Sequence, residues 1–139
     1  MTVSEDGAPT LTLTVPHGAK VIPAKEKTVV QTTNMFLHIW TVREAKTVKE
    51  AAPRVAEVVK GDVLNFKPSE TNSLTVAGGP AALLSGPCVE ADDGDPATAD
   101  VVVFTVGDHA FIACVHGEHN DASREREPMM KILRTAKSP

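Results

Sequence analysis

The sequence is poor in aromatic residues and has no long apolar run. It contains no tyrosine, one tryptophan and four phenylalanines, so it offers no stacking platform for single-stranded nucleic acid. Eighteen acidic residues outnumber fourteen basic ones, giving a net charge of -4, which argues against nucleic acid as a partner. No apolar stretch approaches the length of a membrane-spanning helix. The sequence therefore predicts neither a nucleic-acid partner nor a membrane span.

The apolar residues recur mostly with period two, which is typical of strands with one buried face. Residues 10–15, 29–42 (with a break near Asn34), 55–59, 63–66, 74–76, 101–106, 109–114 and 130–133 are predicted as strands. Only residues 43–52 combine good helix formers with a following proline that would end a helix. Glycine and proline punctuate the gaps between these segments. The pattern predicts an all-β Greek-key sandwich of seven or eight strands with one short helix.

The length of 139 residues fits a single domain over residues 1–139. The polar, acidic residues 1–9 are predicted to be a flexible N-terminal tail, and they lack the features of a signal peptide. No acid–base pair, nucleophile elbow or phosphate loop is present, so no enzyme is predicted. A hydrolase that used Cys114 with His116 or His119 would lack an orienting carboxylate.

Candidate metal ligands gather near the end of the chain. His109, His116 and His119 lie around Cys114, and Met130 follows shortly afterwards. Imidazole, thiolate and thioether together suit copper better than magnesium or calcium. A loop between two anchored strands could present these side chains at one end of a sandwich.

Two segments resemble the cupredoxins, the small blue copper proteins. Residues 111–119, FIACVHGEH, followed by Met130 and Lys131, resemble the copper loop of azurins and phytocyanins. Residues 58–66, VVKGDVLNF, resemble a phytocyanin strand that carries a Gly-Asp pair. The resemblance spans about residues 55–133, and Asn72 stands where the family has its first copper histidine.

The resemblance implies one copper ion held by Cys114, His119 and Met130, with His116 or a residue outside the loop replacing the missing histidine. It implies electron transfer or copper carriage, a redox partner or a copper donor or acceptor protein, and an extracellular or periplasmic location. Because Asn72 is a poor copper ligand, we expect binding weaker than in the intact family.

Each candidate ligand also has a structural interpretation. Cys114 could be half of a disulfide with Cys88, which would make the protein a copper-free binding or structural module. His119 could be a simple loop residue, His116 a solvated one and Met130 a core residue. His38, between Leu37 and Ile39, is predicted to be a structural histidine.

Overall fold

The computed structural model describes residues 2–5, 8–24, 26–33, 35–117 and 121–139. The all-β class is confirmed, because antiparallel strands dominate the described chain in a sandwich-like arrangement of packed layers. The elements are β1 (Thr2–Glu5), β2 (Ala8–Thr12), β3 (Lys20–Ala24), β4 (Lys27–Gln31), β5 (Phe36–Val42), α1 (Val48–Ala51), η1 (Ala52–Arg54), α2 (Val55–Val58), β6 (Val63–Leu64), β7 (Glu70–Val76), β8 (Gly79–Glu90), β9 (Pro96–Val106), β10 (His109–Gly117) and α3 (Asp121–Leu133).

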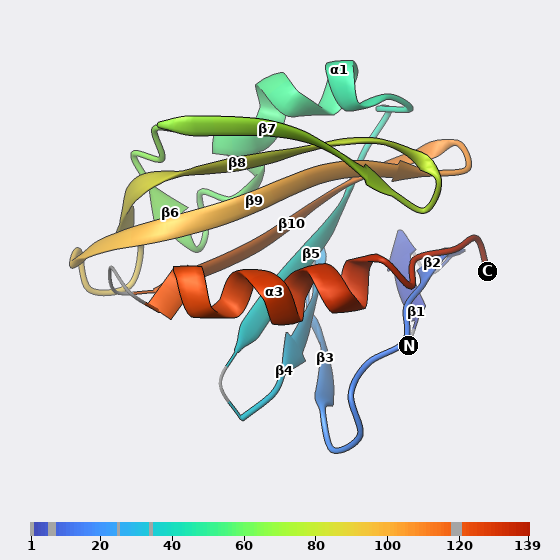
Figure 1. The fold of residues 1–139 in the computed structure, drawn as a ribbon, viewed down its shortest axis with the longest axis horizontal. Coiled ribbons are helices and arrows are strands. Elements are labelled where there is room, and N and C mark those ends of the chain that lie inside the picture. Colours follow the sequence, from blue (N-terminus) through green and yellow to red (C-terminus); the bar gives the residue numbers. More distant parts are fainter. Residues whose placement is uncertain (1, 6–7, 25, 34, 118–120) are drawn as a thin grey trace.

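Eight strands form one antiparallel sheet in the order β3-β4-β5-β10-β9-β8-β6, and β7 pairs with the same outer edge of β8 as β6 does. The sheet twists strongly, so that β3–β5 run steeply across the direction of β7–β9 (Figure 1). Strands β1 and β2 form a separate two-stranded sheet. No helix of the described chain is long and apolar enough to cross a membrane.

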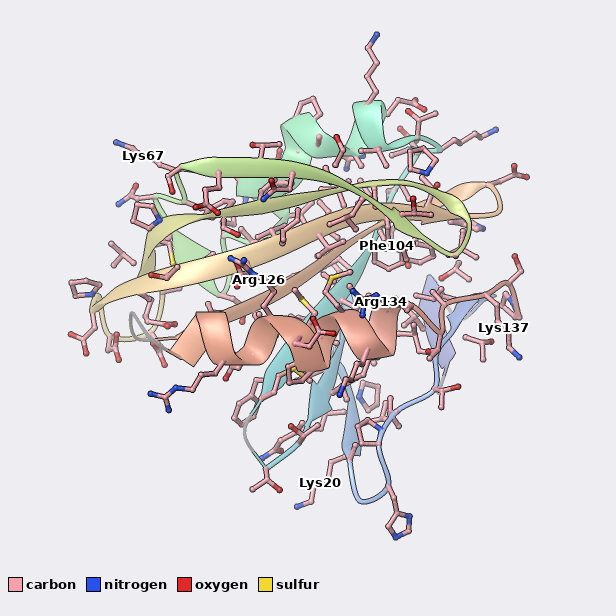
Figure 2. The ribbon with its side chains drawn as sticks, viewed as in Figure 1. Lys20, Lys67, Phe104, Arg126, Arg134 and Lys137 are labelled. Atoms are coloured by element: carbon pink, nitrogen blue, oxygen red, sulfur yellow. The ribbon has the colours of Figure 1, made fainter. Side chains whose placement is uncertain are left out.

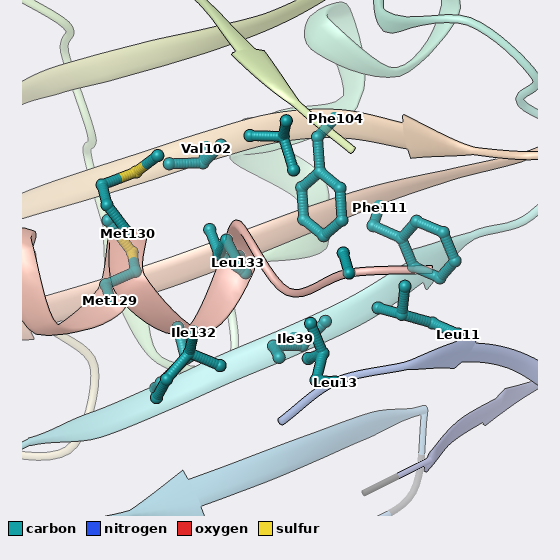
Figure 3. Packing of buried hydrophobic residues seen from close by; sticks show 14 of the residues in the cluster. Leu11, Leu13, Ile39, Val102, Phe104, Phe111, Met129, Met130, Ile132 and Leu133 are labelled. Atoms are coloured by element: carbon teal, nitrogen blue, oxygen red, sulfur yellow. The ribbon is translucent and has the colours of Figure 1, made fainter. Parts of the chain in front are cut away.

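The sheet is covered on both faces, because residues of alternating parity along β9 and β10 belong to two separate buried clusters. On one face, α3 and the β1–β2 hairpin cover a core that contains both phenylalanines of the central strands, Phe104 and Phe111. Figure 3 shows Met129, Ile132 and Leu133 of α3 entering this core. On the other face, α1, η1 and α2 cover a second core around Trp40.

Three predicted elements differ from the observed ones. Residues 130–133, predicted as a strand, form the end of α3, and residues 55–59, also predicted as a strand, contain α2. The predicted tail at residues 1–9 contains β1 and the start of β2, with Val3 buried. The predicted helix is confirmed in part, since α1 begins at Val48, where the Thr47 side chain accepts a hydrogen bond from the Glu50 N–H as an N-cap.

Strand β8 was not predicted, because Gly86 and Pro87 are residues typical of turns. The structure gives Gly86 another role. A Cβ atom at this position would lie 2.1 Å from the Lys67 carbonyl oxygen, which is far inside van der Waals contact. Gly86 therefore lets the backbone of residues 67–69 approach β8, where Ser69 donates an N–H hydrogen bond to the Ser85 carbonyl.

Candidate metal-binding cluster

The central strand β10 directs Cys114 and His116 toward the face that α1, η1 and α2 cover. Cys114 lies opposite His38 of β5 in the strand register. The rings of His38 and His116 stack with their centroids 5.4 Å apart and their planes 22° from parallel. Trp40, two residues along β5, also stacks with His38, with their ring centroids 5.9 Å apart. The sheet thus brings two histidines together from strands distant in the sequence.

Asp62 joins the histidines from the turn that precedes β6. Backbone hydrogen bonds from the N–H groups of Asp62 and Val63 to the Val59 carbonyl fix this turn, and Ala91 donates its N–H to the Asp62 carbonyl. The Asp62 Oδ1 atom lies 3.7 Å from Nδ1 of His38. Its side chain is 15% exposed, so the carboxylate sits largely below the surface.

Lys27, the first residue of β4, pairs with this carboxylate. Its Nζ atom lies 2.8 Å from both Asp62 oxygens and 3.2 Å from Nδ1 of His38, and it stands 5.6 Å from the centre of the Trp40 ring. A lysine ammonium only donates hydrogen bonds, so Nδ1 of His38 is the acceptor in this contact.

Burial sets the protonation of His38. It lowers the pKa of this imidazole from its ordinary 6.5 to about 4, with smaller lowering contributions from Lys27 and His116 and an opposing one from Asp62. His38 is therefore neutral at pH 7. A neutral imidazole is the form that binds metal ions.

One ring nitrogen of His116 lacks the hydrogen bond that a buried imidazole normally makes. Nδ1 lies 2.7 Å from Oε2 of Glu90, at the end of β8. Nε2 is buried without a hydrogen-bond partner among the described residues. A buried polar atom without a partner costs free energy, so Nε2 calls for a functional explanation.

One ligand atom from each of His38, Asp62 and His116 lies within 4.8 Å of the other two. Metal ions bind imidazole nitrogen and carboxylate oxygen at about 2.0–2.2 Å, so donors arranged tetrahedrally around one ion stand about 3.4 Å apart. The ligand atoms therefore need to close by up to about 1.4 Å to hold one ion. Two imidazoles and one carboxylate form a donor set that suits zinc, copper, nickel and iron.

The structure assembles only part of the predicted copper loop. His116 belongs to the cluster, and Cys114 lies fully buried on the same face. Met130 lies in the core beneath α3, on the opposite face of the sheet, so one ion cannot contact both it and Cys114. His119 lies outside the described residues.

Sequence reasoning did not find Asp62 or the role of His38. The period-two pattern put His38 on the face opposite Leu37 and Ile39. It therefore indicated that His38 and Trp40 lie on the same face of the strand. Nothing local in the sequence linked it to Asp62 or His116, because these residues come from separate elements.

The two cysteines are both free and buried. The disulfide of the alternative interpretation is wrong, because β9 separates Cys88 on β8 from Cys114 on β10. Two strand spacings amount to about 9–10 Å, whereas bridged cysteines have Cα atoms within about 7 Å. Burial is the main cause that raises the pKa of the Cys114 thiol well above its ordinary value, and burial likewise raises that of Cys88 to about 11.

We expect two free thiols per chain under denaturing, non-reducing conditions, counted with a chromogenic thiol reagent. In the native protein both should react slowly, because thiolates react and both of these thiols are protonated at neutral pH. A count of zero thiols in the denatured protein would contradict the structure. Fast native labelling of Cys114 would contradict its burial.

Two cavities lined by described residues adjoin the core. A cavity of about 420 Å³ opens beside the cluster, and Asp62 lines it together with Lys27 and Trp40. A larger cavity of about 850 Å³ lies on the other face, between α3 and the segments around Pro16 and Thr33, and it falls within the usual size range of small-molecule sites.

The sequence matches no protein-family model and no curated protein. Solved structures do share the fold. A protein from Bacteroides thetaiotaomicron matches over 93% of this chain at 11% identity and a TM-score of 0.62, and the chain spans 45% of that protein. A protein of unknown function from Pseudomonas aeruginosa matches over 91% of this chain and 95% of its own length, at 13% identity and a TM-score of 0.55.

LpqN of Mycobacterium tuberculosis, described as involved in cell envelope biogenesis, matches over 100% of this chain and 90% of its own, at 16% identity and a TM-score of 0.51. At these identities the likeness to all three concerns the fold alone. None of the three is described as a copper protein.

Proposed function

We propose that the protein binds one transition-metal ion at the cluster formed by His38, Asp62 and His116. The observation that supports this function is the convergence of three donor atoms within 4.8 Å, at a place where Nε2 of His116 has no hydrogen-bond partner among the described residues. An ion that Nε2 ligates would give it a partner. The neutral state of His38 leaves its imidazole ready to serve as a ligand.

Copper is the metal we propose first. For a given site with nitrogen and oxygen donors, affinity among divalent first-row metals rises to a maximum at copper. Two imidazoles and a carboxylate belong to that class of site. Zinc, next to copper in this order, is the natural comparison.

Copper carriage fits this donor set better than electron transfer. A blue copper site needs a thiolate, and Cys114 is not among the side chains whose ligand atoms converge in this cluster. Met130 lies on the far face of the sheet from the histidines. The partner of this function would be a protein that donates or accepts the ion. We propose no catalytic role, because a protonated, fully buried thiol is a poor nucleophile.

Titration of the chelator-treated protein with Cu(II), followed by calorimetry and electron paramagnetic resonance, should show one equivalent bound. Replacing His116 with glutamine, or Asp62 with asparagine, should weaken binding at least about tenfold, since each change removes one ligand. His17→Gln is the matched control, because His17 is exposed and lines the cavity on the opposite face. The bound copper should give no intense thiolate charge-transfer band.

Two outcomes would contradict this site. An intense visible band that Cys114→Ser abolishes would move the copper to the predicted loop site. If neither copper nor zinc binds, metal carriage is wrong. The copper-free binding module then remains, with the 850 Å³ cavity below α3 as its place for a ligand.

A further inference from the structure

Lys27 contacts the cluster that we propose as the metal site. Its ammonium contacts both oxygens of Asp62 at 2.8 Å and Nδ1 of His38 at 3.2 Å, so it engages two of the three side chains of the cluster. The Lys27 side chain is 22% exposed, and that of Asp62 is 15% exposed, so water screens the pair only in part.

An ammonium ion and a metal ion draw on the same lone pairs of Asp62. A metal that binds Asp62 on the side facing His38 must therefore displace the Lys27 ammonium, which lies 2.8 Å from both oxygens and 3.2 Å from Nδ1 of His38. At separations near 4 Å two cations in a partly buried site also repel each other strongly.

We propose that Lys27 is a tethered competitor cation that fills the cluster in the metal-free protein and leaves it when a divalent metal ion binds. This inference rests on the proposed function, since it concerns the same cluster. It gives Lys27 a defined role: it sets the metal affinity of the site, and it neutralises Asp62 while the site is empty.

The neighbouring cavity gives the displaced side chain a place to go. Lys27 lines the cavity of about 420 Å³ together with Glu26 and Glu57, and both of these glutamates are exposed. A lysine has a flexible four-carbon stem and a compact charge, so it can exchange one carboxylate partner for another without moving the backbone. The exchange breaks no covalent bond. It replaces a singly charged cation at Asp62 with a doubly charged one.

The test compares metal binding by the wild-type protein and by Lys27→Met, which removes the charge and keeps an apolar stem near Trp40. We expect Zn(II) and Cu(II) to bind at least about tenfold more tightly to this variant, because no ammonium has to be displaced. Lys60→Met is the matched control. Lys60 lines the same cavity but lies outside the metal-ligand cluster, and we expect its replacement to change affinity less than about twofold.

The outcomes separate this inference from the proposed function. Equal or weaker binding by Lys27→Met than by the wild type overturns the competitor role and leaves the metal site standing. Tight binding by the variant with none by the wild type supports the competitor role and overturns metal carriage by the natural protein. If neither binds, both proposals fall. Circular dichroism establishes folding, and Lys27→Gln, neutral and able to donate a hydrogen bond to Asp62, serves if Lys27→Met does not fold.

The labelling rate of Lys27 tests its displacement directly. Amine-specific labelling with mass spectrometry should modify Lys27 slowly in the metal-free protein, where its ammonium is held against Asp62, and several-fold faster after Zn(II) is added. Lys60, scored in the same digest, should label at one rate in both states. If adding Zn(II) does not change the labelling rate of Lys27, the proposed displacement of Lys27 is wrong.

Discussion

Replacing Arg126 with methionine should lower the free energy of unfolding by about 3 kcal/mol, because it leaves a buried carboxylate without its positive partner. Asp100 on β9 is 1% exposed, and its Oδ1 accepts a hydrogen bond at 2.9 Å from Nη2 of Arg126. The same nitrogen donates to the Ser85 hydroxyl at 3.0 Å. Figure 2 shows Arg126 reaching from α3 toward β9.

Among the ion pairs of the described residues, Arg126 is the only charged partner of Asp100. Oδ2 of Asp100 has no hydrogen-bond partner among these residues. The hydrogen bond with Asp100 is the main cause that raises the pKa of Arg126 above its ordinary value. The arginine side chain is 37% exposed, so we take the lower end of the cost of breaking a buried pair.

Urea denaturation monitored by circular dichroism measures this loss of unfolding free energy. The control is a second arginine of the same C-terminal segment, Arg134. Arg134 pairs with Glu127 at 3.0 Å, but these side chains are 55% and 64% exposed. Arg134→Met should therefore cost less than about 1 kcal/mol. Equal effects of the two substitutions would mean that burial of Asp100 does not determine the cost.

The stability of the metal-free protein should fall as the pH is lowered from 6.5 toward 4, with His38 contributing about 3 kcal/mol to the fall. Burial lowers the pKa of His38 from 6.5 to about 4. Between these values the unfolded chain binds a proton at His38 that the folded protein does not, so acid favours unfolding. Well above pH 6.5 both states are neutral at this residue and the contribution is constant.

Urea midpoints across this pH range, with a chelator present, measure the effect. Lys27, Asp62, Glu90 and His116 also face this cluster, so the wild-type curve alone does not isolate His38. The difference between wild type and His38→Gln isolates the contribution of His38. Parallel curves for the two proteins would show that the buried imidazole titrates as it does in the unfolded chain.

The strand pattern was sufficient to predict most central strands, although β9 and β10 are buried on both faces and carry nearly continuous apolar runs. It placed the strands around residues 29–42 and 101–114 correctly. It failed for α3, where Pro128 suggested a boundary. A helical signal was present all the same, since Met129, Ile132, Leu133 and Ala136 follow the spacing of three, four and seven residues, and all four are buried.

The candidate site could be predicted only in part. Strand alternation was enough to put Cys114 and His116 on one face, because that depends on local geometry. The convergence of Asp62 and His38 depends on the pairing of β5 with β10 and on the turn before β6, and these are long-range contacts. The loop resemblance was carried by spacing alone, which did not reveal that Met130 continues a helix on the opposite face.

The pairing of Thr12 with Lys137 has a consequence for synthesis on the ribosome. Their backbones exchange two hydrogen bonds, at 2.9 and 3.0 Å, across most of the chain length, and Leu11 and Leu13 share a core with Leu133. The β1–β2 hairpin is thus made long before its backbone partner at residue 137. Until α3 and residue 137 have been made, the face of the sheet that they help to cover exposes its apolar residues, so this face closes late in folding.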